Sequence, residues 1–76
     1  MITPAQCRSA RTLLSWSLSK LANAASVPES VIDSFELERQ RPDAATIGAI
    51  QRAFEDVGVV FLPDDDVRVR APSPGK

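Results

Sequence analysis

The fold of this chain is decided by residues 17–36, which read SLSKLANAASVPESVIDSFE. The apolar residues recur here with the period of an α-helix, stop for about three residues and then resume. They are Leu21, Ala22 and Ala25 on the first face, Val27 in the break, and Val31, Ile32 and Phe35 on the second face. This pattern predicts two short helices joined by a tight turn, a helix-turn-helix. Because such a unit commonly places its second helix in the DNA major groove, the stretch also carries a functional hypothesis.

The composition is that of one small globular domain. The chain has 76 residues, 43% of them hydrophobic and 25% charged. Chains of this size bury a modest core, and many add a subunit interface to gain stability. No apolar run approaches the ~20 residues that span a membrane, and no signal peptide is recognisable. We therefore expect no membrane contact and a cytoplasmic location, on the nucleoid when the protein is bound to DNA.

The residue types argue against catalysis and metal binding. The chain has no histidine and one cysteine, which excludes a Cys/His zinc site, an intramolecular disulfide and imidazole catalysis. We interpret Cys7 as a small buried hydrophobic residue rather than a redox sensor. The carboxylates of residues 64–66 lack the spread of ligands that calcium needs, so a solvated turn is favoured over a cation site. We expect no enzyme activity, no metal and no cofactor.

Capping residues predict where the other helices begin. Thr3, Pro4 and Gln6 form a capping box, which starts a helix that ends near Leu14 or Ser15. The expected core side of that helix carries Cys7, Ala10, Leu13 and Leu14. We expect Trp16 to fold back onto the core rather than to stack on a base.

The three following helices have predicted bounds as well. Ser17 caps a helix over about 18–25, and the next helix runs from residue 28 or 29 to about 37. Asp43 caps the last helix, and Gly58 is placed to close it as the C′ residue. The apolar residues that define its buried face are Ile47, Ile50, Ala53, Phe54 and Val57.

After Gly58 the pattern changes to that of β-structure. Residues 59–62 are rich in β-formers and residues 67–70 alternate with period two, which predicts a hairpin of two short strands. A free strand edge is either blunted, here by Arg68 and Arg70, or paired with a second copy. We favour a homodimer formed through the hairpin, with Val59, Phe61, Val67 and Val69 in its interface. Residues 1–71 make the domain, and residues 72–76 are expected to be a flexible tail.

Over about residues 2–62 the chain resembles the lambda-repressor/Cro-like, or xenobiotic-response-element, family of helix-turn-helix regulators. The resemblance rests on Arg8-x-x-Arg11, Trp16-Ser17, Leu21-Ala22, Ala25, Val27, Ile32, Phe35-Glu36, Arg41-Pro42 and residues 53–61. The family implies a mainly α, compact domain of four or five helices with a short C-terminal strand or hairpin. It also implies binding to double-stranded operator DNA as a dimer, and a structural ion pair between Arg11 and Glu36. The family often has Gly where this chain has Ser26, and Ser or Thr where it has Pro28.

The resemblance also implies which residues would meet DNA. The candidates for base readout on the third helix are Glu29, Ser30, Asp33 and Ser34, and the alternative for them is ordinary solvated helix surface. The candidates for phosphate contact are Ser17, Lys20, Arg39, Gln40 and Arg41, with Arg52 as a further one, and the alternative for the two loop arginines is a solvated loop. Because the net charge is -1, affinity for DNA must come from charge distribution.

Two functions follow as expectations. The first is a sequence-specific DNA-binding transcriptional regulator, a dimeric repressor with its third helix in the major groove of an operator. The second is an antitoxin or anti-activator that uses the same fold to bind a protein partner. The carboxylates on the third helix support the second, because an acidic helix can dock on a basic protein.

Overall fold

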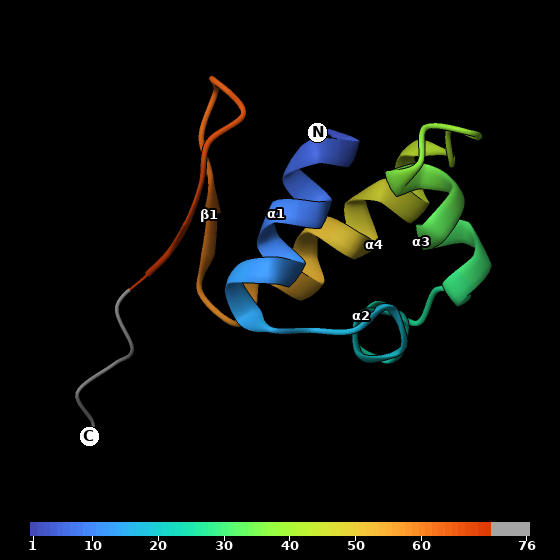
Figure 1. Cartoon of the computed structure of the whole chain (residues 1–76), viewed down its shortest axis with the longest axis horizontal. Coiled ribbons are helices and arrows are strands. Elements are labelled where there is room, and N and C mark those ends of the chain that lie inside the picture. The colour runs from blue at the N-terminus through green and yellow to red at the C-terminus, as the bar shows by residue number, and fades with distance from the viewer. Residues whose placement is uncertain (71–76) are drawn as a thin grey trace.

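The computed structural model describes residues 1–70, which form four helices followed by an antiparallel hairpin (Figure 1). The elements are α1 (Pro4–Leu14), α2 (Leu18–Ala25), α3 (Glu29–Glu36), α4 (Ala44–Glu55), β1 (Val59–Phe61) and β2 (Val67–Val69). This confirms a mainly helical fold that ends in a hairpin. Ala71 and the predicted tail at 72–76 lie outside the described residues. Within residues 1–70, no helix combines the length and apolar character needed to cross a bilayer.

Side-chain caps start three of the four helices, as predicted. The Thr3 hydroxyl accepts from the Gln6 backbone N–H at 3.1 Å, and Gln6 Oε1 accepts from the Thr3 N–H at 3.0 Å. The Ser17 hydroxyl accepts from the Lys20 N–H at 3.0 Å. Asp43 Oδ1 accepts from the Thr46 N–H at 2.8 Å. Hydrogen bonds from Thr46, side chain and backbone, hold the pKa of the Asp43 carboxyl below its ordinary value.

The turn between α2 and α3 has the geometry that a tight connection requires. Ser26 closes α2 in the left-handed conformation, with φ of 57°, and the Val27 N–H donates to the Ala22 carbonyl at 3.1 Å. Pro28 then directs the chain into α3 but offers no side-chain cap. Helix α3 ends at Glu36, one residue before the predicted end.

The helices surround one core at the centre of the molecule. Its largest fully buried side chains are those of Phe54, Leu21, Ile32, Ile47, Ile50 and Cys7. Trp16 is half-buried and stacks on Phe54, with ring centroids 5.7 Å apart, which confirms that it folds onto the core. The burial of Cys7 confirms its interpretation as a core residue.

Two residues predicted on core faces are exposed instead. Leu13 is 52% exposed, because the buried stripe of α1 is narrow and runs through Cys7 and Ala10. Val57 is 47% exposed, because α4 ends at Glu55 and the helical period no longer applies beyond it. Gly58 has a φ of 95°, as a closing glycine should, but because the C-cap is Asp56, Gly58 lies one position beyond the C′ position predicted for it.

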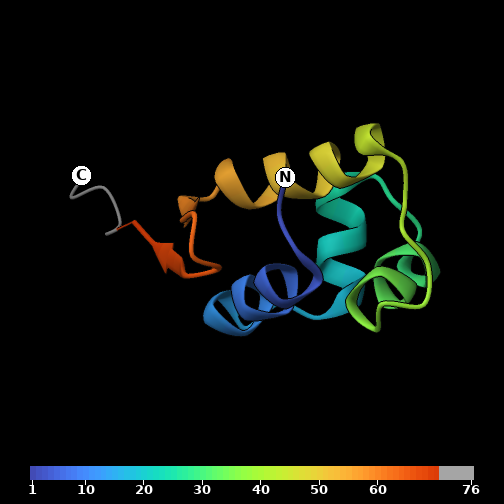
Figure 2. The same ribbon diagram turned by 90° about the horizontal axis from the view of Figure 1, so that it is seen from above.

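The elements are arranged so that the hairpin and α3 lie at opposite ends of the molecule (Figures 1 and 2). Figure 2 shows α4 on one side, α1 and α3 on the other, and α2 spanning the space between them. The hairpin packs on α1 through β2 and on α4 through β1. Helix α2 packs on both α3 and α4, which fixes the position of the helix-turn-helix unit on the core.

The register of the hairpin corrects part of the predicted dimer interface. Val59 pairs with Val69 and Phe61 with Val67. Because directly paired residues of antiparallel strands share a face, all four lie on one side of the hairpin. That side covers the protein's own core: Val59 is 3% exposed, and Phe61 packs edge-on against Phe54 at 5.9 Å. The interface prediction is therefore wrong for Val59, whereas Val69 remains 41% exposed.

Candidate nucleic-acid interface

Helix α3 presents a polar side to solvent and an apolar side to the core. Ile32 and Phe35 are buried, whereas Glu29, Ser30 and Asp33 are exposed. Ser34, the fourth predicted readout residue, is half-buried. The outward side of α3 is thus free to meet a partner along most of the helix, and it carries hydroxyl groups and carboxylates.

Helix α2 adds polar residues to this surface that the sequence interpretation missed. Ser19 and Asn23 line one shallow depression together with Glu29 and the turn residues Ser26 and Pro28. Both α2 residues are exposed and lie four positions apart, so they share a helical face. That spacing on the polar side of α2 was the signal in the sequence that could have identified them.

Ser17 and Lys20, at the start of α2, are both partly engaged within the protein. The Ser17 hydroxyl accepts the Lys20 N–H as a helix cap, and its own proton remains available for donation. The Lys20 ammonium lies over the Trp16 ring, 5.9 Å from the ring centroid. Both side chains are exposed at the same helix start, so the structure brings them together.

The loop after α3 places Arg39, Gln40 and Arg41 on the surface. The backbone N–H groups of Arg39 and Gln40 donate to the Ser34 carbonyl at 2.9 and 3.4 Å, so the loop folds back on the last turn of α3. Glu38 supplies the change of direction with a φ of 59°. Between residues 1 and 70, the side chains of Arg39 and Arg41 have no ion-pair partner.

A partly buried ion pair holds α3 against α1. Arg11 Nη2 and Nε donate to Glu36 Oε1 and Oε2 at 2.6 and 2.7 Å, which is a bidentate geometry. Arg11 Nη1 also donates to the Trp16 carbonyl at 3.1 Å, so one side chain joins α1, α3 and the segment before α2. The hydrogen bond with Glu36 raises the pKa of Arg11 above its ordinary value. The Arg11–Glu36 pair expected from the resemblance is confirmed.

Cys7 is a third member of this cluster that the sequence did not indicate. Its Sγ donates to Glu36 Oε2 at 3.1 Å, and the thiol is fully buried. Burial, followed by the hydrogen bond and charge of Glu36, raises the pKa of the Cys7 thiol far above its ordinary value. The cluster therefore positions helices, and its thiol is held protonated.

The charges of the candidate interface balance one another. Lys20, Arg39 and Arg41 provide three positive charges, and the exposed carboxylates of Glu29, Asp33 and Glu38 provide three negative ones. Glu36 does not count among the exposed charges, because it is buried against Arg11. The cations belong to the elements on either side of α3 in the chain, whereas α3 itself carries only carboxylates.

Within residues 1–70 no group of three acidic, histidine or cysteine side chains is placed to hold a metal ion.

The sequence matches no protein-family model, and no curated protein sequence is significantly similar to it.

Proposed function

We propose that the protein is a sequence-specific DNA-binding regulator of the lambda-repressor/Cro-like helix-turn-helix family, acting as a dimeric repressor. The observation that carries the proposal is the geometry of residues 17–36. Two helices of eight residues each are joined through Ser26 in the left-handed conformation, and the second turns a polar side to solvent. That combination matches a unit whose second helix enters the major groove.

In this proposal the outward side of α3 reads bases. Glu29 can accept a hydrogen bond from cytosine N4, and the Ser30 and Ser34 hydroxyls can bond to several bases. Phosphates would be met by Ser17 and Lys20 at the start of α2 and by the loop residues Arg39 to Arg41. Because one subunit supplies few cations, specific binding requires two subunits on an operator with half-sites about one helical turn apart.

The test is a titration of the protein against DNA from upstream of its own coding sequence, at two salt concentrations and with random duplex as competitor. Binding that resists the competitor and weakens with salt supports the proposal. Failure to bind at low salt would contradict it.

Variants then separate the roles of the residues. Arg41→Ala should weaken binding to all sequences alike and reduce the salt slope by about one, whereas Glu29→Ala should change the preferred base. Arg8→Ala is the matched control, because Arg8 is an exposed arginine of α1 and is not among the candidate DNA contacts. Equal, sequence-independent effects of all three substitutions would refute this division of roles.

A second candidate function, binding of a basic protein partner by an antitoxin or anti-activator, is favoured by one feature of α3. Glu29, Asp33 and Leu37 follow one another at four-residue spacing, and Leu37 is 49% exposed. An acidic stripe that ends in an exposed apolar side chain suits a partner with a basic, partly apolar groove. This function would be supported over the first if the wild-type protein bound a basic protein partner but not duplex DNA, and if Asp33→Asn lost the partner.

A further inference from the structure

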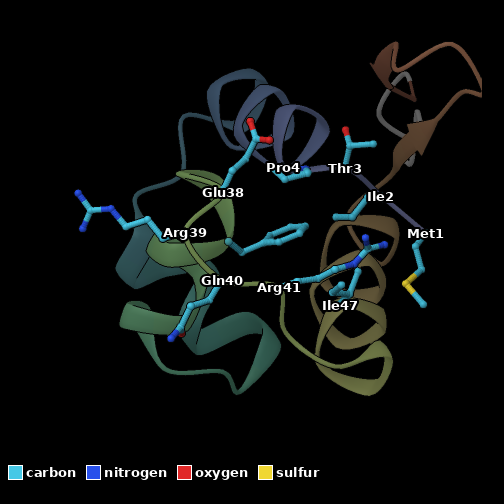
Figure 3. Close-up of a pocket in the computed structure, with 10 residues that line it drawn as sticks. Met1, Ile2, Thr3, Pro4, Glu38, Arg39, Gln40, Arg41 and Ile47 are labelled. Carbon is cyan, nitrogen blue, oxygen red and sulfur yellow. The ribbon is translucent and has the colours of Figure 1, made fainter.

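We infer that a pocket between the N-terminal segment, the loop after α3 and α4 binds a small organic anion with an apolar body, such as an aromatic carboxylate. The pocket has a volume of about 390 Å³ and is drawn in Figure 3. This lies at the lower end of the about 300–1,000 Å³ typical of small-molecule sites. It is therefore large enough for a ligand of one or two rings.

The inner wall of the pocket is apolar and belongs to the core. It is formed by Ile2, Phe35 and Ile47, which are 5%, 3% and 2% exposed and come from three different segments of the chain. Because these residues belong to the core, the wall is formed before any ligand arrives. Such a wall favours an apolar or aromatic group over a fully polar ligand.

One cation extends across the pocket. In Figure 3 the Arg41 side chain points over the pocket toward Ile2 and Met1, whereas Arg39 and Gln40 point away from it. Over the described residues, Arg41 has neither an ion-pair partner nor a side-chain hydrogen bond. A guanidinium group without a partner, beside an apolar wall, can receive a carboxylate through two parallel hydrogen bonds.

The charge at the rim restricts the ligand further. Glu38 also lines the pocket, and Figure 3 shows its carboxylate directed toward α1 rather than toward Arg41. Arg39 also lines the pocket but points away from it, so Arg41 is the arginine placed to receive a carboxylate. The site therefore fits a monocarboxylate attached to one or two rings.

A regulatory consequence rests on the proposed function. Arg41 is also a candidate phosphate contact, and a guanidinium group that is paired with a bound carboxylate is less available to DNA. The ligand should therefore lower the affinity for operator DNA. In this way the same arginine would couple binding of the small molecule to binding of DNA.

The binding step is tested first, without DNA, by following the amide resonances of the ¹⁵N-labelled protein during titration with naphthalene-2-carboxylate. We expect saturable shifts centred on Ile2, Phe35 and Ile47, and binding about tenfold weaker for the neutral amide of the same ring system. Arg41→Gln should weaken carboxylate binding about tenfold. Arg39→Gln should leave it within about twofold, because Arg39 lines the same pocket but points away.

Three outcomes of this titration would overturn the inference. Shifts that do not saturate, equal binding of acid and amide, or equal losses in the two arginine variants would each refute the site. The titration is then repeated with DNA present, where the ligand should weaken DNA binding by the wild type but not by Arg41→Gln. Saturable ligand binding by a protein that binds no DNA would refute the proposed function and leave the site standing. DNA binding that is insensitive to a bound ligand would refute the regulatory consequence alone.

Discussion

Among single residues, Glu36 is the one charged residue that is buried within residues 1–70. It is 4% exposed, accepts two hydrogen bonds from Arg11 and one from Cys7, and thereby connects α3 to α1. A buried carboxylate is stable only when such partners are present. The position of α3, and with it the candidate interface, depends on this side chain together with the core packing of Ile32 and Phe35.

Replacing Glu36 by Gln should destabilise the protein by about 2 kcal/mol, because the Arg11 charge loses its partner in a partly buried site. The Arg11 side chain is 20% exposed, which moderates the loss. Urea unfolding followed by circular dichroism measures the change. Glu38→Gln is the matched control. Because Glu38 is exposed, the free energy of unfolding of this variant should stay within about 0.5 kcal/mol of the wild-type value. An equal effect of the two substitutions would contradict a structural role for the pair.

Cys7 should be unreactive in the folded protein. Burial raises the pKa of its thiol, so the reactive thiolate is scarce, and a thiol reagent such as Ellman's should react only as fast as the protein opens. Because folding raises the pKa of this thiol, the protonated Cys7 contributes its full stabilisation below the pKa of the thiol in the unfolded chain. This contribution is lost progressively as the pH rises from that value toward the pKa in the folded protein. Cys7→Ala should lack this part of the alkaline destabilisation. Rapid labelling under native conditions would refute the assignment.

At the scale of secondary-structure elements, local capping explains why the helices begin where they do. Thr3, Ser17 and Asp43 each accept a backbone N–H three residues later, and each was recognised in the sequence. Helix α3 is different, since Pro28 offers no side-chain cap and the preceding Ser26 adopts a left-handed conformation. The connection between α2 and α3 thus combines two locally unfavourable features, and packing must stabilise it.

Replacing Ser26 by Gly should stabilise the protein by about 0.5 kcal/mol. A non-glycine residue in the left-handed region costs about 1 kcal/mol of stability, which Gly would recover. The greater conformational freedom of Gly in the unfolded chain cancels about half of this gain. Ser30→Gly is the control, because Ser30 is exposed inside α3 and the same change there should cost about 0.5 kcal/mol. Thermal unfolding of both variants gives the comparison. A loss of stability in Ser26→Gly would show that the turn is not strained.

At the scale of the whole molecule, the hairpin and α3 occupy opposite ends (Figure 1). The Arg70 N–H donates to the Gly58 carbonyl at 2.7 Å, and the Leu62 N–H donates to the Asp66 carbonyl at 2.9 Å. In an antiparallel pair, alternate residues of a strand bond to the partner strand, so the backbone N–H and C=O groups of Val67 and Val69 point away from β1. These groups form the outer edge of β2. The Val67 N–H donates to Asp66 Oδ1 at 2.9 Å, so the backbone of Val69 is the part of this edge that remains open for pairing. A dimer joined along this edge would hold its two α3 helices far apart.

Replacing Val69 by Lys should therefore convert the expected dimer to monomers, because a lysine at an edge strand discourages pairing. Sedimentation equilibrium measures the mass. Leu37→Lys is the control, since Leu37 is similarly exposed but lies at the end of α3, far from the hairpin. Phe61 is unsuitable for this test, because it packs on Phe54 and its replacement would perturb the core. Dissociation caused by Leu37→Lys alone would place the interface at α3.

The order of the elements and most of their boundaries follow from local features of the sequence. Caps, turn residues and apolar periods act over a few neighbouring positions, so the start of α2 at Leu18 and the strand pair after Gly58 could be predicted without knowing what packs against them. The Arg11–Glu36 pair was predictable only through a family resemblance, because no local rule joins residues that are 25 positions apart.

Which side chains meet across the fold could be learned from the three-dimensional packing alone. It buries Val59 and exposes Leu13 and Val57, and it joins Gln6 Nε2 to the Leu62 carbonyl at 3.1 Å across 56 positions. It also brings three distant segments together around the pocket beneath Arg41. The physical reason is that a helical or strand period fixes which residues share a face, whereas the packing of the elements decides which faces are covered and which remain open.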